Sequence, residues 1–414
     1  MTYLEATQWM FVKLPMYQRD GKIAFKKNLS NIIAFCAYLG NPEKKFKSIH
    51  VGGTNGKGST SHMLASILQE AKYKVGLYTS PHLKSFTERI RINGLDISKE
   101  KVIDFVQQNK GFIDKQKLSF FEMTVGFAFS EFAREKVDIA VIEVGLGGRL
   151  DSTNIITPEV SVITNIGLDH TQFLGHTLQE IAQEKAGIIK TGIPVIIGQK
   201  QQETTAVFVQ RAEECCSEIV FASESKTLYS TDLLGDYQKF NIKTALTALK
   251  YLKDFKIKQI HIQKGLLNTV KNTGIEGRWQ VLQTSPKIIC DTAHNKEALL
   301  CVLNQLKKEE FKTLHIVLGF VSDKNLDQIL PLFPKQAMYY FCKPAIPRGL
   351  SESKLQAKAK QYELKGEKYP SVASAYNHLL FNLKINDLAY IGGSNFVVAE
   401  VLYENSSEQQ TITN

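Results

Sequence analysis

The sequence lacks any long apolar run. Its longest apolar stretches, Val137–Val144 and Ile193–Gly198, are far shorter than the ~20 residues that a membrane-spanning helix requires. The segment Met1–Lys13 includes Glu5 and has neither a continuous apolar stretch nor a small-residue cleavage site, which argues against a signal peptide. We therefore expect a cytoplasmic protein with no membrane partner.

Cysteine is also scarce, with six residues among 414 and no CxxC spacing. This pattern suits neither a zinc site nor a dithiol redox centre. We expect reduced thiols at all six positions, which are Cys36, Cys215, Cys216, Cys290, Cys301 and Cys342.

No basic run interleaved with aromatic residues occurs, although the formal net charge is +10. Such runs are typical of nucleic-acid-binding proteins, so we expect no nucleic-acid partner. The charge fits two interpretations, a solvated basic surface and a positive cleft that attracts anionic substrates, and a mixture of both is consistent with the composition.

The composition, 43% hydrophobic and 22% charged, is that of an ordinary globular protein long enough for two or three domains. Short β-branched runs alternate with helical patterns, which predicts a mostly parallel sheet built from βαβ units. The expected strands are 47–51, 74–79, 137–143, 160–164 and 194–198.

The alternation stops over a more helical stretch, 237–270, and a glycine-bearing connector, 271–277. We predict an α/β protein whose first domain, P-loop-containing and built on a mostly parallel sheet, covers 1–274. A smaller Rossmann-like α/β domain follows over 275–414. Its expected strands are 287–290, 313–318, 337–341 and 388–391.

The first chemical motif is a glycine-rich loop, VGGTNGKGS, over 51–59. Backbone amides of such a loop and of the helix that follows bind phosphates, and Lys57 would reach the β and γ oxygens. The spacing departs from the usual P-loop because Gly58 separates Lys57 from Ser59. A simple glycine-rich turn is the alternative, but strand, loop, lysine and helix occur in the order that phosphate binding requires.

The second motif ends an expected strand with Glu143 and continues through a glycine-rich loop to Asn154. A carboxylate at a strand end beside a phosphate loop is well placed to hold Mg²⁺, directly or through water. The alternative is a surface carboxylate at a strand end, which the three glycines that follow disfavour.

The third motif combines His170 with a helix that a capping box, Thr177 and Glu180, predicts to begin nearby. The helical period places Lys185 on the apolar face. A buried unpaired ammonium is costly, so Lys185 must reach solvent, pair with a carboxylate, or be neutralised or modified. The period does not choose among these, and a lone histidine is more often structural than a metal ligand.

The fourth motif joins Arg278 to the segment CDTAHN over 290–295, directly after an expected strand. Arg278 could bind a phosphate, and Asp291 could accept from ribose or adenine-side donors. Turn and helix-cap chemistry at Asp291 and Asn295 is the alternative. We recognise no Ser/His/Asp or Cys/His set for covalent catalysis.

Together and in this order, the motifs resemble those of the folylpolyglutamate synthase and dihydrofolate synthase family, within the Mur ligase superfamily. The resemblance runs over nearly the whole chain. Its segments are TNGKGS (54–59), TSPHL (79–83), ERIRING (88–94), FFEMT (120–124), EVGLGGRLDSTN (143–154), LDH (168–170), EKAG (184–187) and DTAHN (291–295).

The resemblance implies an ATP-dependent amide ligase that adds L-glutamate to dihydropteroate and to tetrahydrofolate through an acyl phosphate. The implied nucleotide contacts are Asn55, Gly56, Lys57, Gly58, Ser59, Asn241, Arg278 and Asp291. The implied ligands of two Mg²⁺ ions are Ser80, Glu143 and His170, and the resemblance allows K⁺ as a further cation.

The resemblance further implies that Lys185 is carbamylated and faces the second metal, and that His294 lies near the phosphates. Together with Lys57 and His170, these two residues form the expected catalytic set. The implied pteroate contacts are Phe121, Asp151 and Ser152, the last standing where many relatives carry alanine. We expect a monomer whose partners are small-molecule substrates.

Three rival functions stay open. Folylpolyglutamate synthase activity alone is the nearest. A peptidoglycan-precursor ligase is disfavoured, because such enzymes carry a nucleotide-sugar-binding domain ahead of the loop. A P-loop regulatory or transport ATPase would explain the phosphate loop and Glu143, but not Phe121 or the pair Arg278 and Asp291.

Overall fold

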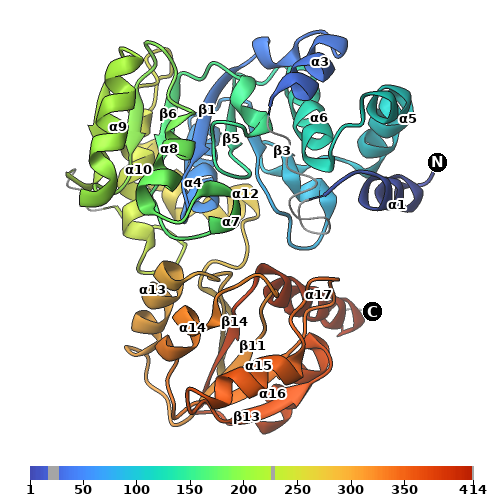
Figure 1. Cartoon of the computed structure of the whole chain (residues 1–414), viewed down its shortest axis with the longest axis vertical. Helices are drawn as coiled ribbons and strands as arrows, with labels where there is room; N and C mark the ends of the chain where they lie inside the picture. The colour runs from blue at the N-terminus through green and yellow to red at the C-terminus, as the bar shows by residue number, and fades with distance from the viewer. Residues whose placement is uncertain (17–27, 225–228, 413–414) are drawn as a thin grey trace. The chain divides into compact units, whose positions relative to one another are not determined.

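The computed structural model describes residues 1–16, 28–224 and 229–412. It divides into two compact units (Figure 1). Unit 1 comprises Met1–Asp232 and Gln238–Ile275, and unit 2 comprises Leu233–Tyr237 and Glu276–Asn414. Among the described residues, no helix combines the length and hydropathy that a bilayer span requires.

Unit 1 is built around an eight-stranded sheet in the order β4-β3-β2-β5-β1-β6-β7-β8. The strands from β2 to β8 in this order are parallel, and β3 and β4 add an antiparallel edge. The strand bounds are β1 Lys47–Gly52, β2 Val75–Tyr78, β3 Ile90–Ile92, β4 Leu95–Asp96, β5 Ile139–Glu143, β6 Val160–Ile163, β7 Val195–Ile197 and β8 Ile219–Phe221.

The α-helices of unit 1 connect and cover these strands. Serine and threonine caps start several of them: Ser98 caps α5, Ser119 forms a capping box with Glu122 in α6, and Thr177 does so with Glu180 in α8. The helix bounds are α1 Tyr3–Lys13, α3 Ser30–Tyr38, α4 Lys57–Glu70, α5 Lys99–Gln116, α6 Phe120–Arg134, α7 Thr171–Leu174, α8 Leu178–Ala186, α9 Gln202–Glu214, α10 Gln238–Leu249, α11 Gln259–Leu267 and α12 Thr269–Thr273.

Unit 2 contains a six-stranded sheet in the order β13-β12-β11-β14-β10-β9, parallel except for β9. Its strands are β9 Gln280–Thr284, β10 Lys287–Cys290, β11 Leu314–Leu318, β12 Met338–Cys342, β13 Gly366–Tyr369 and β14 Leu388–Gly392. Its α-helices are α13 Lys296–Leu306, α14 Leu326–Ile329, α15 Glu352–Lys360, α16 Val372–Asn382 and α17 Asn395–Ile412.

The predicted fold class, two mostly parallel α/β sheets, is confirmed, and each of the nine strands expected from β-branched runs occurs within two residues of its expected ends. The strands that the sequence pattern missed are β3, β4, β8, β9 and β13.

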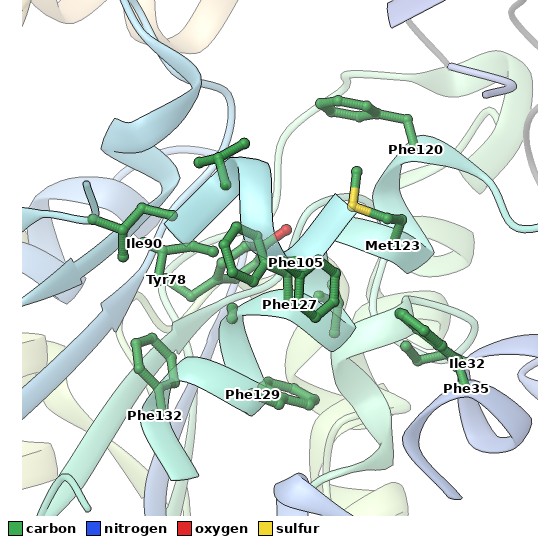
Figure 2. Close-up of a cluster of buried hydrophobic side chains, with 14 of the residues drawn as sticks. Ile32, Phe35, Tyr78, Ile90, Phe105, Phe120, Met123, Phe127, Phe129 and Phe132 are labelled. Atoms are coloured by element: carbon green, nitrogen blue, oxygen red, sulfur yellow. The ribbon is translucent and has the colours of Figure 1, made fainter. Parts of the chain in front are cut away.

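An aromatic core supports one end of the eight-stranded sheet. Phe105 of α5 and Phe127 of α6 stack with ring centroids 4.2 Å apart, and Figure 2 shows them together within this cluster. Tyr78 at the end of β2 and Phe120 at the start of α6 belong to the same buried cluster. The core therefore fixes the segments that carry Ser80 and Phe121.

Candidate functional site

The glycine-rich loop connects β1 to α4 and needs glycine at two positions. Gly56 has φ +85°, and an added Cβ would lie 2.2 Å from the side-chain oxygen of Asn241. Gly53 has φ +134°, and its added Cβ would lie 1.9 Å from Oγ1 of Thr164. Because side chains rarely adopt these φ values and neither position has room, glycine is required at both.

Hydrogen bonds attach this loop to the segment that follows β6. The amides of Thr54 and Asn55 donate to the carbonyl and side-chain oxygens of Asn165 at 2.8 and 2.9 Å. The amide of Gly167 donates in return to Oγ1 of Thr54 at 3.0 Å. The segment continues to His170, which precedes α7 with φ +51°, so His170 lies on a segment bonded directly to the phosphate loop.

The first turn of α4 carries Lys57 and Ser59. Nζ of Lys57 donates to the carbonyls of Gly53 and Thr54 at 3.1 and 3.2 Å. Oγ of Ser59 accepts from Nε2 of Gln238 at 3.2 Å, and Oε1 of Gln238 accepts from Asn241 at 2.8 Å. Gln238 thus supports the loop. The sequence did not predict this role, because the residues around Gln238 form no recognisable motif.

Glu143 ends β5 beside the phosphate loop, where Val51 of β1 is its register partner. The side chain is 5% exposed, and its Oε2 accepts from the amide of Ser80 at 3.2 Å. A carboxylate and a neighbouring serine are hard oxygen donors that fit Mg²⁺ when substrate oxygens complete the coordination. Within the described ranges no group of three His, Cys, Asp or Glu side chains is placed to hold a metal, so these residues alone do not form a closed site.

Lys185 lies in the last turn of α8 with 4% of its surface exposed, on the buried face that its helical period predicts. Its Nζ donates to the carbonyl of Gly53 at 2.8 Å. Burial and, to a smaller extent, the charge of Lys57 lower the pKa of Lys185 to about 7, against the opposing effects of Asp169 and Asp151. The side chain therefore neither reaches solvent nor forms an ion pair with a described carboxylate, which excludes two of the four fates that the sequence left open.

The loop after Glu143 packs its backbone against the end of α8. A Cβ at Gly148 would lie 2.8 Å from the carbonyl oxygen of Glu184, and one at Gly187 would lie 2.3 Å from Cβ of Arg149. The amide of Arg149 donates to the Glu184 carbonyl at 2.7 Å. This close approach, which glycine permits, brings the loop onto the turn that carries Lys185.

Two predicted pteroate contacts, Phe121 and Asp151, converge on Gly145. A Cβ there would lie 2.3 Å from the Phe121 ring and 3.2 Å from Oδ2 of Asp151. The Asp151 carboxylate accepts from the amides of Leu146 at 2.8 Å and Thr153 at 3.0 Å. Burial raises its pKa, and these hydrogen bonds oppose the rise. The third predicted contact, residue 152, begins the short 3₁₀ turn that Asp151 caps.

A buried arginine orders the segment that carries Ser80. Arg89 is 3% exposed, its Nε donates to Nδ1 of His82 at 2.7 Å, and its guanidinium lies 5.2 Å from the centroid of the Phe120 ring. Glu88 accepts from the three successive amides of 83–85 at 2.8, 2.8 and 2.6 Å. The segment after β2 is thus held by side chains from the ERIRING motif.

In unit 2, Asp291 follows β10 and is surrounded by donors. Its Oδ2 accepts from the hydroxyl of Tyr237 at 2.6 Å and from the amide of Trp279 at 2.7 Å, and its Oδ1 accepts from the amide of Ala293 at 2.8 Å. Burial raises the pKa of Asp291, against the hydrogen bond from Tyr237 and the charge of Arg278. Tyr237 is a partner that the sequence analysis missed, because 54 residues separate it from Asp291.

Arg278 and His294 lie on the same two segments of unit 2. Arg278 donates to Oγ1 of Thr292 and to the Gly277 carbonyl, and Nδ1 of His294 donates to the Thr292 carbonyl at 2.9 Å. Asn295 caps α13 by accepting from the amide of Ala298 at 3.0 Å. The turn and cap chemistry considered as an alternative is therefore present at Asp291 and Asn295, in addition to any ligand contact.

Each unit thus assembles its own part of the predicted site. Unit 1 holds the phosphate loop with Asn241, the predicted metal ligands, Lys185 and the predicted pteroate contacts, whereas unit 2 holds Arg278, Asp291 and His294. In unit 1 these residues follow the carboxyl ends of β1, β2, β5 and β6, which are neighbours in the sheet, or lie on helices that pack there. That edge is where ligands bind in open α/β sheets.

Two domain families match the chain. The Mur ligase middle domain matches residues 51–268, and the Mur ligase glutamate ligase domain matches residues 277–395. A dihydrofolate synthase/folylpolyglutamate synthase of Bacillus subtilis is 35% identical over 359 residues, covering 79% of this chain and 82% of that protein. A folylpolyglutamate synthase of Lacticaseibacillus casei is 33% identical over 363 residues, covering 79% and 83%.

Solved structures agree over nearly the full length. Escherichia coli FolC in complex with DHPP and ADP superimposes with a TM-score of 0.86 at 27% identity, covering 99% of both chains. A bifunctional folylpolyglutamate synthase/dihydrofolate synthase with Mn, AMPPNP and L-glutamate bound has a TM-score of 0.83 at 28% identity, covering 98% of both chains.

Proposed function

The chain belongs to the folylpolyglutamate synthase and dihydrofolate synthase family of Mur ligases, and from this premise we propose how its residues carry out the reaction. It is an ATP-dependent glutamate ligase that acts on dihydropteroate and on tetrahydrofolate. The observation that carries the assignment of roles is the convergence of the phosphate loop, Glu143, Lys185 and the Phe121–Asp151 pair at one edge of the eight-stranded sheet.

The reaction has two steps. A carboxylate is a poor electrophile, so an oxygen of the pteroate or folate carboxylate first attacks the γ-phosphorus of ATP. The new P–O bond forms as the bond to the ADP oxygen breaks, which yields an acyl phosphate. The amine of L-glutamate then attacks the acyl carbon, inorganic phosphate leaves, and the amine loses a proton as the amide forms.

The phosphate loop acts in the first step. The amides of Asn55 to Ser59 hold the triphosphate, and Nζ of Lys57 moves from loop carbonyls to the β and γ oxygens, where it balances the charge on the transferring group. Glu143 and Ser80 would hold one Mg²⁺, which would supply positive charge to the phosphate oxygens. His170 would be the ligand of a second Mg²⁺, and K⁺ remains a further predicted cation.

Lys185 is proposed to be carbamylated. Its neutral amine attacks the carbon of CO₂, a C–N bond forms as one C=O π bond breaks, and the nitrogen releases a proton. The buried amine thereby becomes a carbamate anion, which would face the predicted second metal. The support is the combination of burial to 4% exposure, the absence of an ion pair with a described carboxylate, and a pKa of about 7. A neutral amine is the form that reacts with CO₂.

The remaining roles concern binding. Phe121, Asp151 and Ser152 hold the pterin end of the acyl substrate. Asn241 supports the triphosphate from α10, while Arg278, Asp291 and His294 contribute the contacts of unit 2 to ATP. The enzyme mainly orients three substrates and excludes water from the acyl phosphate. We propose that it does so as a monomer.

Phosphate release by the purified protein tests this function. With ATP and Mg²⁺, we expect release that requires L-glutamate and occurs with dihydropteroate and with tetrahydrofolate. Release with tetrahydrofolate alone would reduce the function to folylpolyglutamate synthase, the name of the Lacticaseibacillus casei relative. Release that ignores all acyl substrates and glutamate would reject the ligase and favour an ATPase.

A further inference from the structure

We propose that His50 is a positioning residue for the acyl substrate, which acts through Thr153 to orient Asp151. This inference rests on the proposed pteroate-binding role of Asp151. His50 lies in β1, between Ile142 of β5 and Ser161 of β6 in the register, and its side chain is 0% exposed. No role described above uses it.

Within the part of the chain that the structure describes, the imidazole has one hydrogen-bond partner. Its Nε2 lies 2.9 Å from Oγ1 of Thr153, whereas its Nδ1 is buried without a partner among the described residues. A buried polar group costs free energy unless it is hydrogen-bonded, so a histidine in the centre of a sheet is a costly choice over a β-branched residue. The bond to Thr153 is what the imidazole contributes.

The direction of this bond follows from the next contact. Oγ1 of Thr153 lies 2.5 Å from Oδ1 of Asp151, a carboxylate that also accepts from the amides of Thr153 and Leu146. A hydroxyl has one proton, and here that proton goes to the carboxylate. His50 must therefore donate from Nε2, as a neutral imidazole protonated at that nitrogen.

Burial keeps His50 in this neutral state, because burial and, to a smaller extent, the charge of Lys190 lower the pKa of the imidazole to about 3. The chain of donors thus runs one way, from His50 to Thr153 to Asp151. It stops the hydroxyl of Thr153 from turning to another acceptor. Asp151 in turn fixes the backbone at Leu146, next to the point where Phe121 meets Gly145.

The position of His50 in β1 connects this hydrogen-bond network to the phosphate loop. β1 continues past His50 directly into Gly53 and the phosphate loop. One strand therefore fixes both the loop proposed to hold the triphosphate and, through Thr153, the loop proposed to hold the pterin. A rigid link between the two keeps the acyl carboxylate in line with the γ-phosphate, where misplacement is costly.

The same unit offers a matched control. His62 of α4 is also buried, and its Nδ1 lies 2.8 Å from Oγ1 of Thr273. Thr273, however, donates at 2.6 Å to the carbonyl of Thr269, so this network ends in a helix carbonyl. Substituting His62 removes an equivalent buried histidine–threonine contact without touching Asp151.

Steady-state kinetics of His50 variants test the proposal. Methionine at 50 has no donor, whereas the amide nitrogen of glutamine can replace Nε2. We expect His50→Met to raise the KM for dihydropteroate about 10-fold, the equivalent of one hydrogen bond, with the KM for ATP unchanged, and His50→Gln to restore most of the loss. Thr153→Val should reproduce the His50→Met effect, and the double variant should be no worse than either single variant.

The control His62→Met should lower the melting temperature and leave the KM for dihydropteroate unchanged. The positioning role would be overturned if His50→Met changed the KM for dihydropteroate and the KM for ATP equally, or changed neither. Additive effects of His50→Met and Thr153→Val in the double variant would also overturn it. If His50→Met fails to fold, Thr153→Val against Thr153→Ser provides the same comparison, since only serine keeps the hydroxyl.

A measurement without turnover addresses the direction of the bond. The ¹⁵N shifts of the His50 ring in the wild-type protein at pH 6 should report a neutral imidazole protonated at Nε2, and protonation at Nδ1 would overturn the inference.

A wild-type protein without glutamate-dependent phosphate release would refute the proposed function. An active wild type with an unaffected His50→Met variant would refute the positioning role alone.

Discussion

Lys185 in unit 1 and Asp291 in unit 2 are both buried and charged in their ordinary state, but their surroundings differ. Lys185 donates to one loop carbonyl, has no ion-pair partner among the described residues, and has a pKa of about 7. Asp291 accepts from Tyr237 and from two backbone amides. Both environments disfavour the charged form by burial, yet only that of Asp291 compensates it with several hydrogen bonds.

The difference separates two uses of a buried ionisable group. A lysine with a lowered pKa is partly present as the neutral amine, which is nucleophilic and can therefore be modified covalently. A carboxylate with three donors is rigid, which suits the shaping of a binding surface around Arg278 and Trp279. We therefore expect substitution of Lys185 to affect turnover and substitutions around Asp291 to affect nucleotide affinity.

The largest effect is expected at Lys185. Lys185→Ala should lower kcat roughly 1000-fold, which is the size of effect seen when a major charge-stabilising group is removed from an enzyme active site. Short carboxylates should partly rescue the activity of this variant. Lys190→Ala is the control: Lys190 is only partly buried and also donates to a carbonyl, that of Asn154, and no carboxylate should rescue this variant. Full activity of Lys185→Ala, or a lack of rescue, would contradict carbamylation.

The wild-type protein should show a matching pH dependence. The lowered pKa means that the neutral amine becomes more abundant as pH rises through about 7. After removal of CO₂, bicarbonate should therefore restore activity more completely at pH 8 than at pH 6. The opposite order would show that the amine is not the group being modified.

The next largest effect is expected at Gly56. Gly56→Ala should reduce kcat/KM about 100-fold, because the added methyl would displace Asn241 or the loop by a distance that catalysis does not tolerate. Gly192→Ala is the control, since Gly192 also has a positive φ, +70°, but open space around its Cβ. Equal activity of the two variants would show that backbone strain alone matters at Gly56.

An intermediate effect is expected at Glu143. Glu143→Gln should raise the Mg²⁺ concentration for half-maximal activity by about 10- to 100-fold, as loss of a ligand charge weakens metal binding. Glu131→Gln changes another buried carboxylate of unit 1, one that pairs with Arg134, and should leave the Mg²⁺ titration unaltered. An unaltered titration for Glu143→Gln would remove this residue from the metal site.

The smallest effect is expected in unit 2. Tyr237→Phe deletes one of the donors to Asp291 and should raise the KM for ATP about 5-fold, with the pteroate KM unchanged. Tyr340→Phe removes a hydroxyl that contacts Nδ1 of His315 at 3.0 Å in the same unit, and serves as the control. A pteroate-specific effect of Tyr237→Phe would break the proposed contrast between the units.

The sequence pattern predicted central strands better than edge strands. Buried parallel strands carry near-continuous apolar runs rich in Val and Ile, as β5 does with the sequence IAVIE. By contrast, the edge strand β4 carries Asp96, which pairs at 2.7 Å with Arg91 of the neighbouring β3, and the edge strand β13 has the sequence GEKY. Edge strands tolerate charge because one side of their backbone is unpaired, so they lack the pattern that identifies a strand.

The sequence likewise predicted some residues of the candidate site and missed others. Motif residues such as Lys57, Glu143 and Lys185 are recognisable because their chemistry depends on spacing within a single loop or helix. Gln238, Tyr237 and His50 were missed because each contacts a residue at least 54 positions away in the chain. Nothing in a local segment distinguishes a glutamine, tyrosine or histidine with such a partner from one in an ordinary core.

By itself, the sequence determined the features that depend on neighbouring residues: the glycines of the phosphate loop, the capping box that starts α8, and the place of Lys185 on the apolar face of that helix. Only the tertiary structure decided which groups are neutral and which way their hydrogen bonds run. The pKa of Lys185 and the donor chain from His50 to Asp151 both depend on desolvation and on partners that folding alone brings within reach.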